Sequence, residues 1–491
     1  MKQTIFPIDF STYYPIGIQP CPMYIDIANR IYHRIKDVVL PLPDADELKK
    51  QIAINVAIYY EDKMSGIQLW NAFVAKHLLA YSHKLPFFDD CGSLENDDVN
   101  AKEVELLIWI VISRNFNDRF LNPIVMAEDT ARSIMEVLTE DDEVDVNEEL
   151  YNFIYNSDKA DDYFKIKPVL MWLRRSYLLS SPLSEEKFNE LKYNYSMQFN
   201  KSESIYYAET TFSTTTEIGP MAVKPHLWLA DMYYENDLPQ KAKRLMNLEY
   251  CEQDAFEVIE EDEEFVVLKR STDETYKLKN INPNMFRKGS YICTALVKYA
   301  DNYWEINGVM FKTSKDIFDK MHERYEKLKK SYEHAYTTYI ERTKGKRLAF
   351  FEKTEQMKDW LKEISPEVDF SDMYGQLPDG AQVGFISKKA GLIFAPNIIH
   401  AIKCKDNPYY GKCDAKTMLQ ETMDAVINIE YTHPELLNYL LENNMLQDGD
   451  ISFNDPSESG NKIFTRNIDF IARNHRRHHY HRYPWKYDGP N

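Results

Sequence analysis

Between Phe256 and Lys312 the apolar residues change from helical spacing to short runs rich in β-branched and aromatic side chains. These runs are FEVIEEDEEFVVLKR, TYKLKNI, GSYICTALVKY and YWEINGVMFK, and acidic or Asn/Gly turns separate them. Such runs predict strands. Five short strands within about 55 residues match the size of a small SH3-like or OB-like barrel. We therefore expect a small β-barrel-like domain inserted at 251–313 in an otherwise helical chain.

Elsewhere the apolar residues recur at the three- and four-residue steps of an amphipathic helix. The sequence predicts helices at Met23–Ile35, Leu48–Tyr60, Ile67–Tyr81, Asn100–Asn115 and Ser314–Lys344. Only 15 glycines occur in 491 residues, which favours helices over tightly turned β structure. Helices of this kind stabilise one another by burying their apolar faces. We expect an α+β protein that is mainly helical.

The chain is longer than the size at which one hydrophobic core keeps growing, so several structural units are expected. The predicted parts are a helical bundle at 1–125, a helical continuation with an acidic loop at 126–250, the β insertion at 251–313, one long amphipathic helix at 314–345, and a mixed α/β part with a basic tail at 346–491. Within the second part, Thr210–Thr216 is predicted to be a strand or a polar loop.

Charge and cysteine usage limit the class of protein. A net charge of −19 argues against general adhesion to nucleic acid or anionic lipid, because neutralising phosphates supplies that affinity. The longest apolar run, Leu106–Ile112, is far shorter than the roughly 20 residues of a membrane span. The six cysteines form no C-x-x-C pair, and the N-terminus lacks the apolar run of a signal peptide. We predict a soluble cytoplasmic protein with reduced thiols and no membrane partner.

The common catalytic signatures do not occur. The sequence contains no phosphate-binding G-x-x-x-x-G-K-[ST], no G-x-G-x-x-G, no G-x-S-x-G and no H-E-x-x-H. Acidic pairs such as Glu61-Asp62 and Asp89-Asp90 stand at predicted helix ends, where carboxylates commonly cap a helix or face solvent. We therefore predict no cofactor and assign no catalytic residue.

The stretch RNHRRHHYHRYPW, Arg473 to Trp485, holds four arginines and four histidines. Residues 461–491 contain seven Lys or Arg and two Asp, a formal charge of +5 on an acidic protein. Arginine mixed with aromatic residues is the composition that binds phosphates and stacks on bases. The candidate binding residues are Arg473, Arg476, Arg477, Tyr480, Arg482 and Trp485. The alternative is a tail that docks on the protein's own acidic surface.

The same stretch raises a metal hypothesis. If the helix continues to Pro484, the pairs His475/His479 and His478/His481 each stand about one turn apart. Such pairs can grip zinc or another divalent metal. A closed site needs further ligands, and the neighbouring arginines oppose an added cation. The four histidines are therefore candidate metal ligands, although the positive charge of the neighbouring arginines opposes metal binding.

Several stretches resemble an uncharacterised bacterial family known only as a domain of unknown function and found mostly in gut anaerobes. They are Tyr59–Asp89, Val104–Ile112, Lys344–Ile364, Asp406–Tyr410 and Leu440–Arg477, and together they span most of the chain. The resemblance is a pattern of aromatic and polar residues and contains no catalytic motif. It implies no activity and no functional residue, and it fades after Arg477, before most of the histidines.

Three functional hypotheses follow. The preferred one is a cytosolic, non-enzymatic binding or scaffold protein with an unknown protein partner. The second is a metal-assisted hydrolase or nuclease whose site is assembled from distant carboxylates and histidines, and it requires an open pocket where such groups converge with perturbed pKa values. The third is a nucleic-acid-associated protein that uses the basic C-terminal tail.

Overall fold

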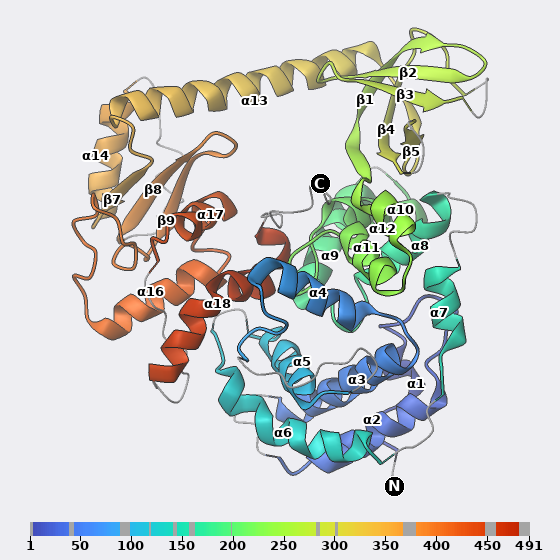
Figure 1. Cartoon of the computed structure of the whole chain (residues 1–491). Coiled ribbons are helices and arrows are strands. Elements are labelled where there is room, and N and C mark those ends of the chain that lie inside the picture. The colour runs from blue at the N-terminus through green and yellow to red at the C-terminus, as the bar shows by residue number, and fades with distance from the viewer. Residues whose placement is uncertain are drawn as a thin grey trace. The chain divides into compact units, whose positions relative to one another are not determined.

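The computed structural model describes residues 3–38, 44–88, 99–116, 119–140, 145–156, 163–197, 199–280, 285–299, 303–366, 380–446 and 458–480. The fold is mixed α+β and mainly helical, as predicted (Figure 1). It divides into two compact units. The first includes Met1–Asn115 and Pro123–Tyr325, and the second consists of Phe116–Asn122 and Glu326–Arg482. The finer division into five parts stays a prediction.

The first unit begins with six helices, and the second to the fifth of them follow the predicted segments closely. They are α1 Pro7–Phe10, α2 Pro22–Ile35, α3 Ala45–Met64, α4 Leu69–Tyr81, α5 Ala101–Ser113 and α6 Pro123–Leu138. Ser65 and Gly66 lie between α3 and α4. Every residue of α5 from Glu103 to Ser113 is buried. A helix that is apolar on all sides belongs at the centre of a bundle, because none of its faces gains from contact with water.

Six further helices complete the helical part of this unit. They are α7 Glu148–Tyr155, α8 Tyr163–Leu173, α9 Pro182–Ser196, α10 Lys201–Thr215, α11 Pro225–Glu235 and α12 Pro239–Met246. The prediction of a strand or loop at Thr210–Thr216 is wrong, because α10 runs through it. The hydroxyls of Thr214 and Thr215 donate to the carbonyl oxygens of Thr210 and Thr211 one turn earlier, at 2.9 and 2.7 Å. These bonds satisfy the hydroxyls inside the helix instead of competing with it.

The β insertion is a curled antiparallel sheet, seen beside α13 in Figure 1. Its strands are β1 Glu249–Glu261, β2 Phe265–Arg270, β3 Thr275–Lys279, β4 Tyr291–Lys298, β5 Glu305–Ile306 and β6 Phe311–Thr313. The strand order is β3-β2-β1-β4-β5, with β6 also paired to β4. A bridge between Leu278 and Trp304 brings the two ends of this path together. The result is a half-barrel around buried Phe256 and Leu268.

The second unit contains a smaller antiparallel sheet with strand order β7-β8-β9. Its elements, with the helix that leads into it, are α13 Lys315–Arg342, β7 Leu348–Phe351, α14 Thr354–Ile364, β8 Gln382–Ser387, β9 Gly391–Pro396, α16 Ala415–Ile427, α17 Pro434–Glu442, α18 Glu458–Arg476 and the 3-10 turn η1 Arg477–His479. Buried Val383 and Phe385 of β8 share a core with Leu436 and Leu440 of α17. In the described residues of both units, no helix is long and apolar enough to cross a membrane.

Gly219 is a position where the fold depends on a missing side chain. Its φ is +73°, and a Cβ atom there would lie 2.5 Å from Leu179 Cδ2 and 2.8 Å from the Trp228 ring. We expect Gly219→Ala to lower the free energy of unfolding by about 2–4 kcal/mol, from overpacking and a left-handed alanine together. Denaturant unfolding followed by circular dichroism measures the loss.

Gly17→Ala is the matched control, because Gly17 has a φ of +91° and a Cβ there would meet no atom within 4 Å. It carries the backbone cost alone, about 1 kcal/mol. Equal losses in the two variants would show that crowding at Gly219 contributes nothing.

Candidate functional site

The carboxylates of Glu61 and Asp62, near the end of α3, lie in the core, with exposed fractions of 0% and 4%. Asp62 Oδ1 accepts the N–H of Leu69 at 3.1 Å. Its Oδ2 accepts the N–H of Trp70 and the hydroxyl of Tyr177, both at 2.8 Å. Asp62 thus caps α4, which is the role expected of a carboxylate between two helices, although the cap is buried.

Glu61 is also fully engaged by its own chain. Its carboxylate accepts the hydroxyl of Tyr14 and, at 2.8 Å, the side-chain amide of Asn147. Burial raises the pKa of Glu61 to about 6 and that of Asp62 to about 6. A metal-assisted enzyme would need such carboxylates to line an open pocket. These two are closed off from solvent, so we interpret them as a structural network that ties helices together.

The arginines of the C-terminal stretch lie inside the second unit. Arg473, Arg476 and Arg477 have exposed fractions of 0%, 0% and 1%. The Arg476 guanidinium donates to the hydroxyl of Thr432 at 2.7 Å and to the carbonyl oxygen of the same residue. Arg473 Nε donates to Asp469 Oδ2 at 2.9 Å. Arg476 therefore fastens α18 to the segment before α17, whereas the Arg473–Asp469 pair lies within α18.

Of the other residues predicted to bind nucleic acid, the structure describes only Tyr480. Tyr480 is buried, and its hydroxyl donates to Asp469. Arg482 and Trp485 lie outside the described residues. The predicted binding of nucleic acid by this tail stays untested, and the structure gives the described part of it an internal role.

The histidines do not lie on one continuous helix. α18 ends at Arg476, and Arg477 has a φ of +46°, so the chain turns before His478. His475 and His478 are buried, the rings of His478 and His479 lie 4.1 Å apart, and His481 lies outside the described residues. The spacing argument for one-turn histidine pairs fails at this turn. Within the described ranges, no group of three or more His, Cys, Asp or Glu side chains is placed to hold a metal ion.

A different cluster, in the first unit, lines an open cavity of about 290 Å³ that we call the arginine pocket. Its lining comes from the segment after α1, from α3, from the end of α5 and from the connection between α8 and α9: Thr12, Tyr13, Gln51, Arg114, Asn115, Arg174, Arg175, Ser180, Ser181, Pro182, Ser184 and Glu185. Three guanidinium groups and the start of a 15-residue helix meet there. This gathering is unusual in a protein with a net charge of −19.

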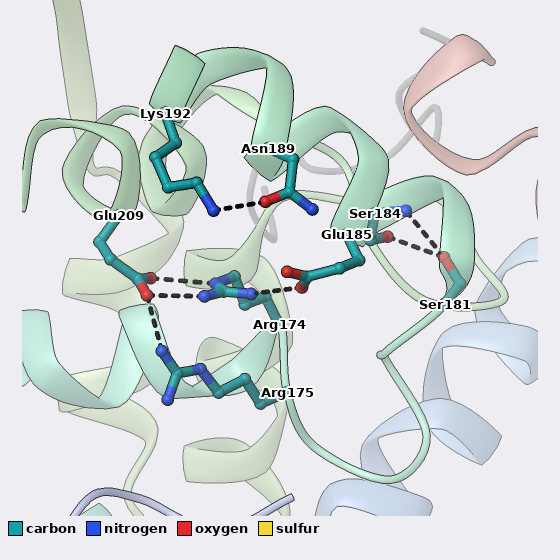
Figure 2. A network of polar contacts seen from close by, with 8 residues as sticks. All are labelled: Arg174, Arg175, Ser181, Ser184, Glu185, Asn189, Lys192 and Glu209. Atoms are coloured by element: carbon teal, nitrogen blue, oxygen red, sulfur yellow. Dashed lines mark hydrogen bonds and ion pairs between the residues drawn. The ribbon is translucent and has the colours of Figure 1, made fainter. Parts of the chain in front are cut away.

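Two of these arginines are neutralised by carboxylates, as Figure 2 shows. Arg174 Nε and Nη2 donate to the two oxygens of Glu209 at 3.0 and 2.7 Å, and Nη1 donates to Glu185 at 2.9 Å. Arg175 donates to the same Glu209 at 2.8 Å. The Phe188 ring lies under the Arg174 guanidinium, 3.7 Å from its centroid. Such a packed, bidentate pair is rigid and holds the wall of the pocket in place.

Arg114 differs from its neighbours. Its Nη2 donates to the carbonyl oxygen of Tyr177 at 2.6 Å and its Nη1 to Asn55 at 3.4 Å, both neutral acceptors. Among the described residues no carboxylate pairs with it, and its Nε has no hydrogen-bond partner. Burial lowers the pKa of Arg114 to about 10. Three guanidinium groups against the carboxylates of Glu185 and Glu209 leave the pocket one positive charge in excess.

The position of Arg114 follows from its place in the chain. It is the residue immediately after α5, and its backbone N–H bonds to the carbonyl oxygen of Ile110. The carboxyl end of a helix attracts a cation and offsets part of its charge. Arg174 and Arg175 stand before Ser181, which caps α9 by accepting the N–H of Ser184 at 3.1 Å. Two adjacent arginines ahead of a capped helix were a signal for this pocket, whereas nothing local marked Arg114.

The raised pKa of Glu61 makes stability depend on pH. The folded chain holds a proton on Glu61 up to about pH 6, while the unfolded chain loses it near the ordinary value of 4.5. The contribution is fully present below pH 4.5 and is lost as the pH rises through 6. We expect Glu61→Gln to gain about 2 kcal/mol of unfolding free energy relative to the native chain between pH 4 and pH 7.

Urea unfolding at several pH values measures this difference. Glu128→Gln, which changes an exposed carboxylate on α6, is the matched control. A constant difference between Glu61→Gln and the native chain over this pH range would contradict the assignment.

The ion pair that forms the pocket wall should be needed for stability. Arg174→Met leaves buried Glu209 with Arg175 alone, and breaking a buried pair on one side costs about 3 kcal/mol. Arg132→Met removes the same charge at an exposed fraction of 67% and should change stability by less than about 0.5 kcal/mol. Denaturant midpoints of both variants test this, and a similar small effect in each would show that Glu209 does not need its partner.

Comparison with known proteins is consistent with the resemblance seen in the sequence. No curated protein and no solved structure matches the chain. One family model matches residues 4–323 and 300–477, and its description is "Protein of unknown function (DUF3843)". The match ends at residue 477, so it includes all residues of the arginine pocket and leaves out His478, His479 and His481. Since the match extends over most of the chain, this protein belongs to the family described as Protein of unknown function (DUF3843).

Proposed function

We propose that this protein binds a small anion, a phosphate or a carboxylate, in the arginine pocket. The observation that carries the proposal is Arg114: a partly buried guanidinium that lines an open cavity and pairs with no carboxylate among the described residues. Buried charges are normally paired, because the loss of hydration costs more than hydrogen bonds to neutral groups return. An anion in the cavity supplies the missing partner.

The rest of the pocket supports an anion more than a cation or a reacting substrate. Guanidinium groups bind the oxygens of carboxylates and phosphates in a planar fork. Ser181 and Ser184 place hydroxyls at the start of α9, where the helix dipole also favours negative charge. Both serines are engaged with each other, and no histidine or cysteine lines the cavity as described. We therefore favour binding over catalysis.

This proposal gives the predicted binding protein a class of ligand. We also propose that the protein lies in the cytoplasm. Cys21, Cys251, Cys293, Cys404 and Cys413 are all free thiols, which supports a reducing compartment such as the bacterial cytoplasm.

A protein partner is a second candidate, supported by the middle of α13. Tyr325, Leu328 and Tyr332 follow one another at steps of three and four, with exposed fractions of 41%, 44% and 37%. Residues at this spacing share one helix face, and an exposed apolar face is the kind of surface a second helix covers. A scaffold role would use this face, independently of the arginine pocket.

Titration calorimetry with inorganic phosphate at fixed ionic strength tests the anion proposal. We expect saturable binding to the native chain with a Kd below about 1 mM. Arg114→Met should weaken it at least ten-fold, because a charged hydrogen bond contributes about 1.5–3 kcal/mol. Arg132→Met, with the same change of charge on exposed α6, should bind as the native chain does.

Two results would contradict the proposal. One is the absence of saturable heat with both phosphate and acetate. The other is equal weakening by Arg114→Met and Arg132→Met, which would mean that the anion responds only to overall charge.

A further inference from the structure

A second cavity lies against the arginine pocket and has a different character. It has a volume of about 350 Å³ and is lined by Tyr14, Pro15, Ile16, Phe153, Pro168, Met171, Trp172, Arg175, Ser202, Ile205, Tyr206 and Glu209. Most of these side chains are aromatic or aliphatic, and they come from α7, α8, α10 and the segment before α2. We call it the apolar pocket. Its size is at the lower end of small-molecule sites, which begin at about 300 Å³.

The two pockets share one wall. Arg174 and Arg175 line the arginine pocket, while Arg175 and Glu209 line the apolar pocket. Both arginines pair with Glu209, so these two ion pairs form the partition (Figure 2). Arg175 has an exposed fraction of 34%, against 6% for Arg174. The described residues give the Arg175 side chain one hydrogen bond, to Glu209, so most of its guanidinium N–H donors are available to a ligand.

The hydroxyl of Tyr206 is a second donor that could bind an anion. The ammonium of Lys167 donates to the hydroxyl oxygen of Tyr206 at 3.0 Å. Because that oxygen accepts a hydrogen bond from a cation, the O–H of Tyr206 is polarised and remains available to donate to another acceptor. Lys167 is buried and pairs with no carboxylate in the described part of the chain. An apolar cavity edged by Arg175 and Tyr206 therefore suits a ligand with one anionic end.

We propose that the ligand is an amphiphilic carboxylate with an apolar body of about eight carbon atoms, its carboxylate between Arg175 and Tyr206 and its body in the apolar pocket. This inference goes beyond the proposed function: it assigns a second, neighbouring site that does not include Arg114, and it names the class of anion that this site takes. Such a ligand differs from an inorganic anion because its affinity depends on the length of its apolar body.

The rim of the cavity supports an apolar body. Ile16 is 91% exposed and Ile205 is 37% exposed, although both line the pocket. Apolar side chains clustered at a cavity mouth mark a site that another apolar group covers. Trp172 also lines the pocket and is 6% exposed, and its indole N–H donates to the carbonyl oxygen of Tyr13 at 2.8 Å, which fixes the ring.

Calorimetric titration of the full chain with acetate, hexanoate, octanoate and octanol is the test. We expect affinity to rise about four-fold for each added methylene. Octanol should bind roughly ten-fold more weakly than octanoate, because it lacks the charge that Arg175 recognises. Octanoate that binds no more tightly than acetate, or no more tightly than octanol, would overturn the inference.

Two variants locate the body and the carboxylate. Met171→Glu puts a carboxylate into the apolar pocket and should abolish octanoate binding. Tyr206→Phe removes only a hydroxyl from a side chain that is 38% exposed, but that hydroxyl is also the acceptor for buried Lys167, so circular dichroism must first show that the variant is folded. The folded variant should bind octanoate roughly ten-fold more weakly. Native-like octanoate affinity in Tyr206→Phe would exclude the proposed position of the carboxylate.

A phosphate titration of the same samples separates this inference from the proposed function. If phosphate binds and octanoate does not, the amphiphilic ligand is excluded and the anion site stands. If neither binds, both proposals fall. Octanoate binding that Arg114→Met leaves unchanged but Tyr206→Phe weakens supports the apolar pocket as the determinant of specificity.

Discussion

The helical part of the first unit depends on charged groups that are buried and satisfied by their own chain. Asp62 is the clearest case, since one carboxylate holds the first turn of α4 and the hydroxyl of Tyr177 after α8. A carboxylate loses its hydration when it is buried, so it remains charged only where several donors converge on it. The segments that supply those donors are therefore fixed relative to α3. This favours one packing arrangement of the helices over the alternatives.

In the arginine pocket, two arginines are neutralised by carboxylates of the same chain, and Arg114 is not. Arg174 and Glu209 satisfy each other in the interior, and the Phe188 ring packs on the guanidinium. Arg114 occupies a similar environment with neutral acceptors only. Buried Arg476 also has only neutral acceptors, but Arg114 lines an open cavity that an anion can enter, and this makes its missing partner informative. The pocket combines a rigid wall with an unneutralised donor, which is the arrangement expected of a preformed anion site.

The C-terminal stretch shows what composition leaves open. Arginine, histidine and tyrosine in one short segment have the composition of a nucleic-acid-binding surface. In the structure Arg473 and Arg476 are buried, and their donors bind Asp469 and Thr432 of the same unit. Composition reports which groups can form hydrogen bonds, but the partner of each group depends on which segments pack beside it. The turn at Arg477 also ends the helix that the histidine spacing assumed.

The sequence by itself determined the helices of the bundle, the place of the β insertion and the long helix α13, because these depend on the local spacing of apolar residues. It did not determine α10, where threonine hydroxyls bond within the helix although their composition favoured a strand or loop. Apart from the adjacent Arg174 and Arg175, nothing in the sequence marked the two pockets. Arg114, Arg175 and Tyr206 are far apart in the chain, and only the packing of α5, α8 and α10 decides which of them keep a carboxylate partner and which face a cavity. A charge becomes a site through what surrounds it in space, and that is information the tertiary structure alone supplies.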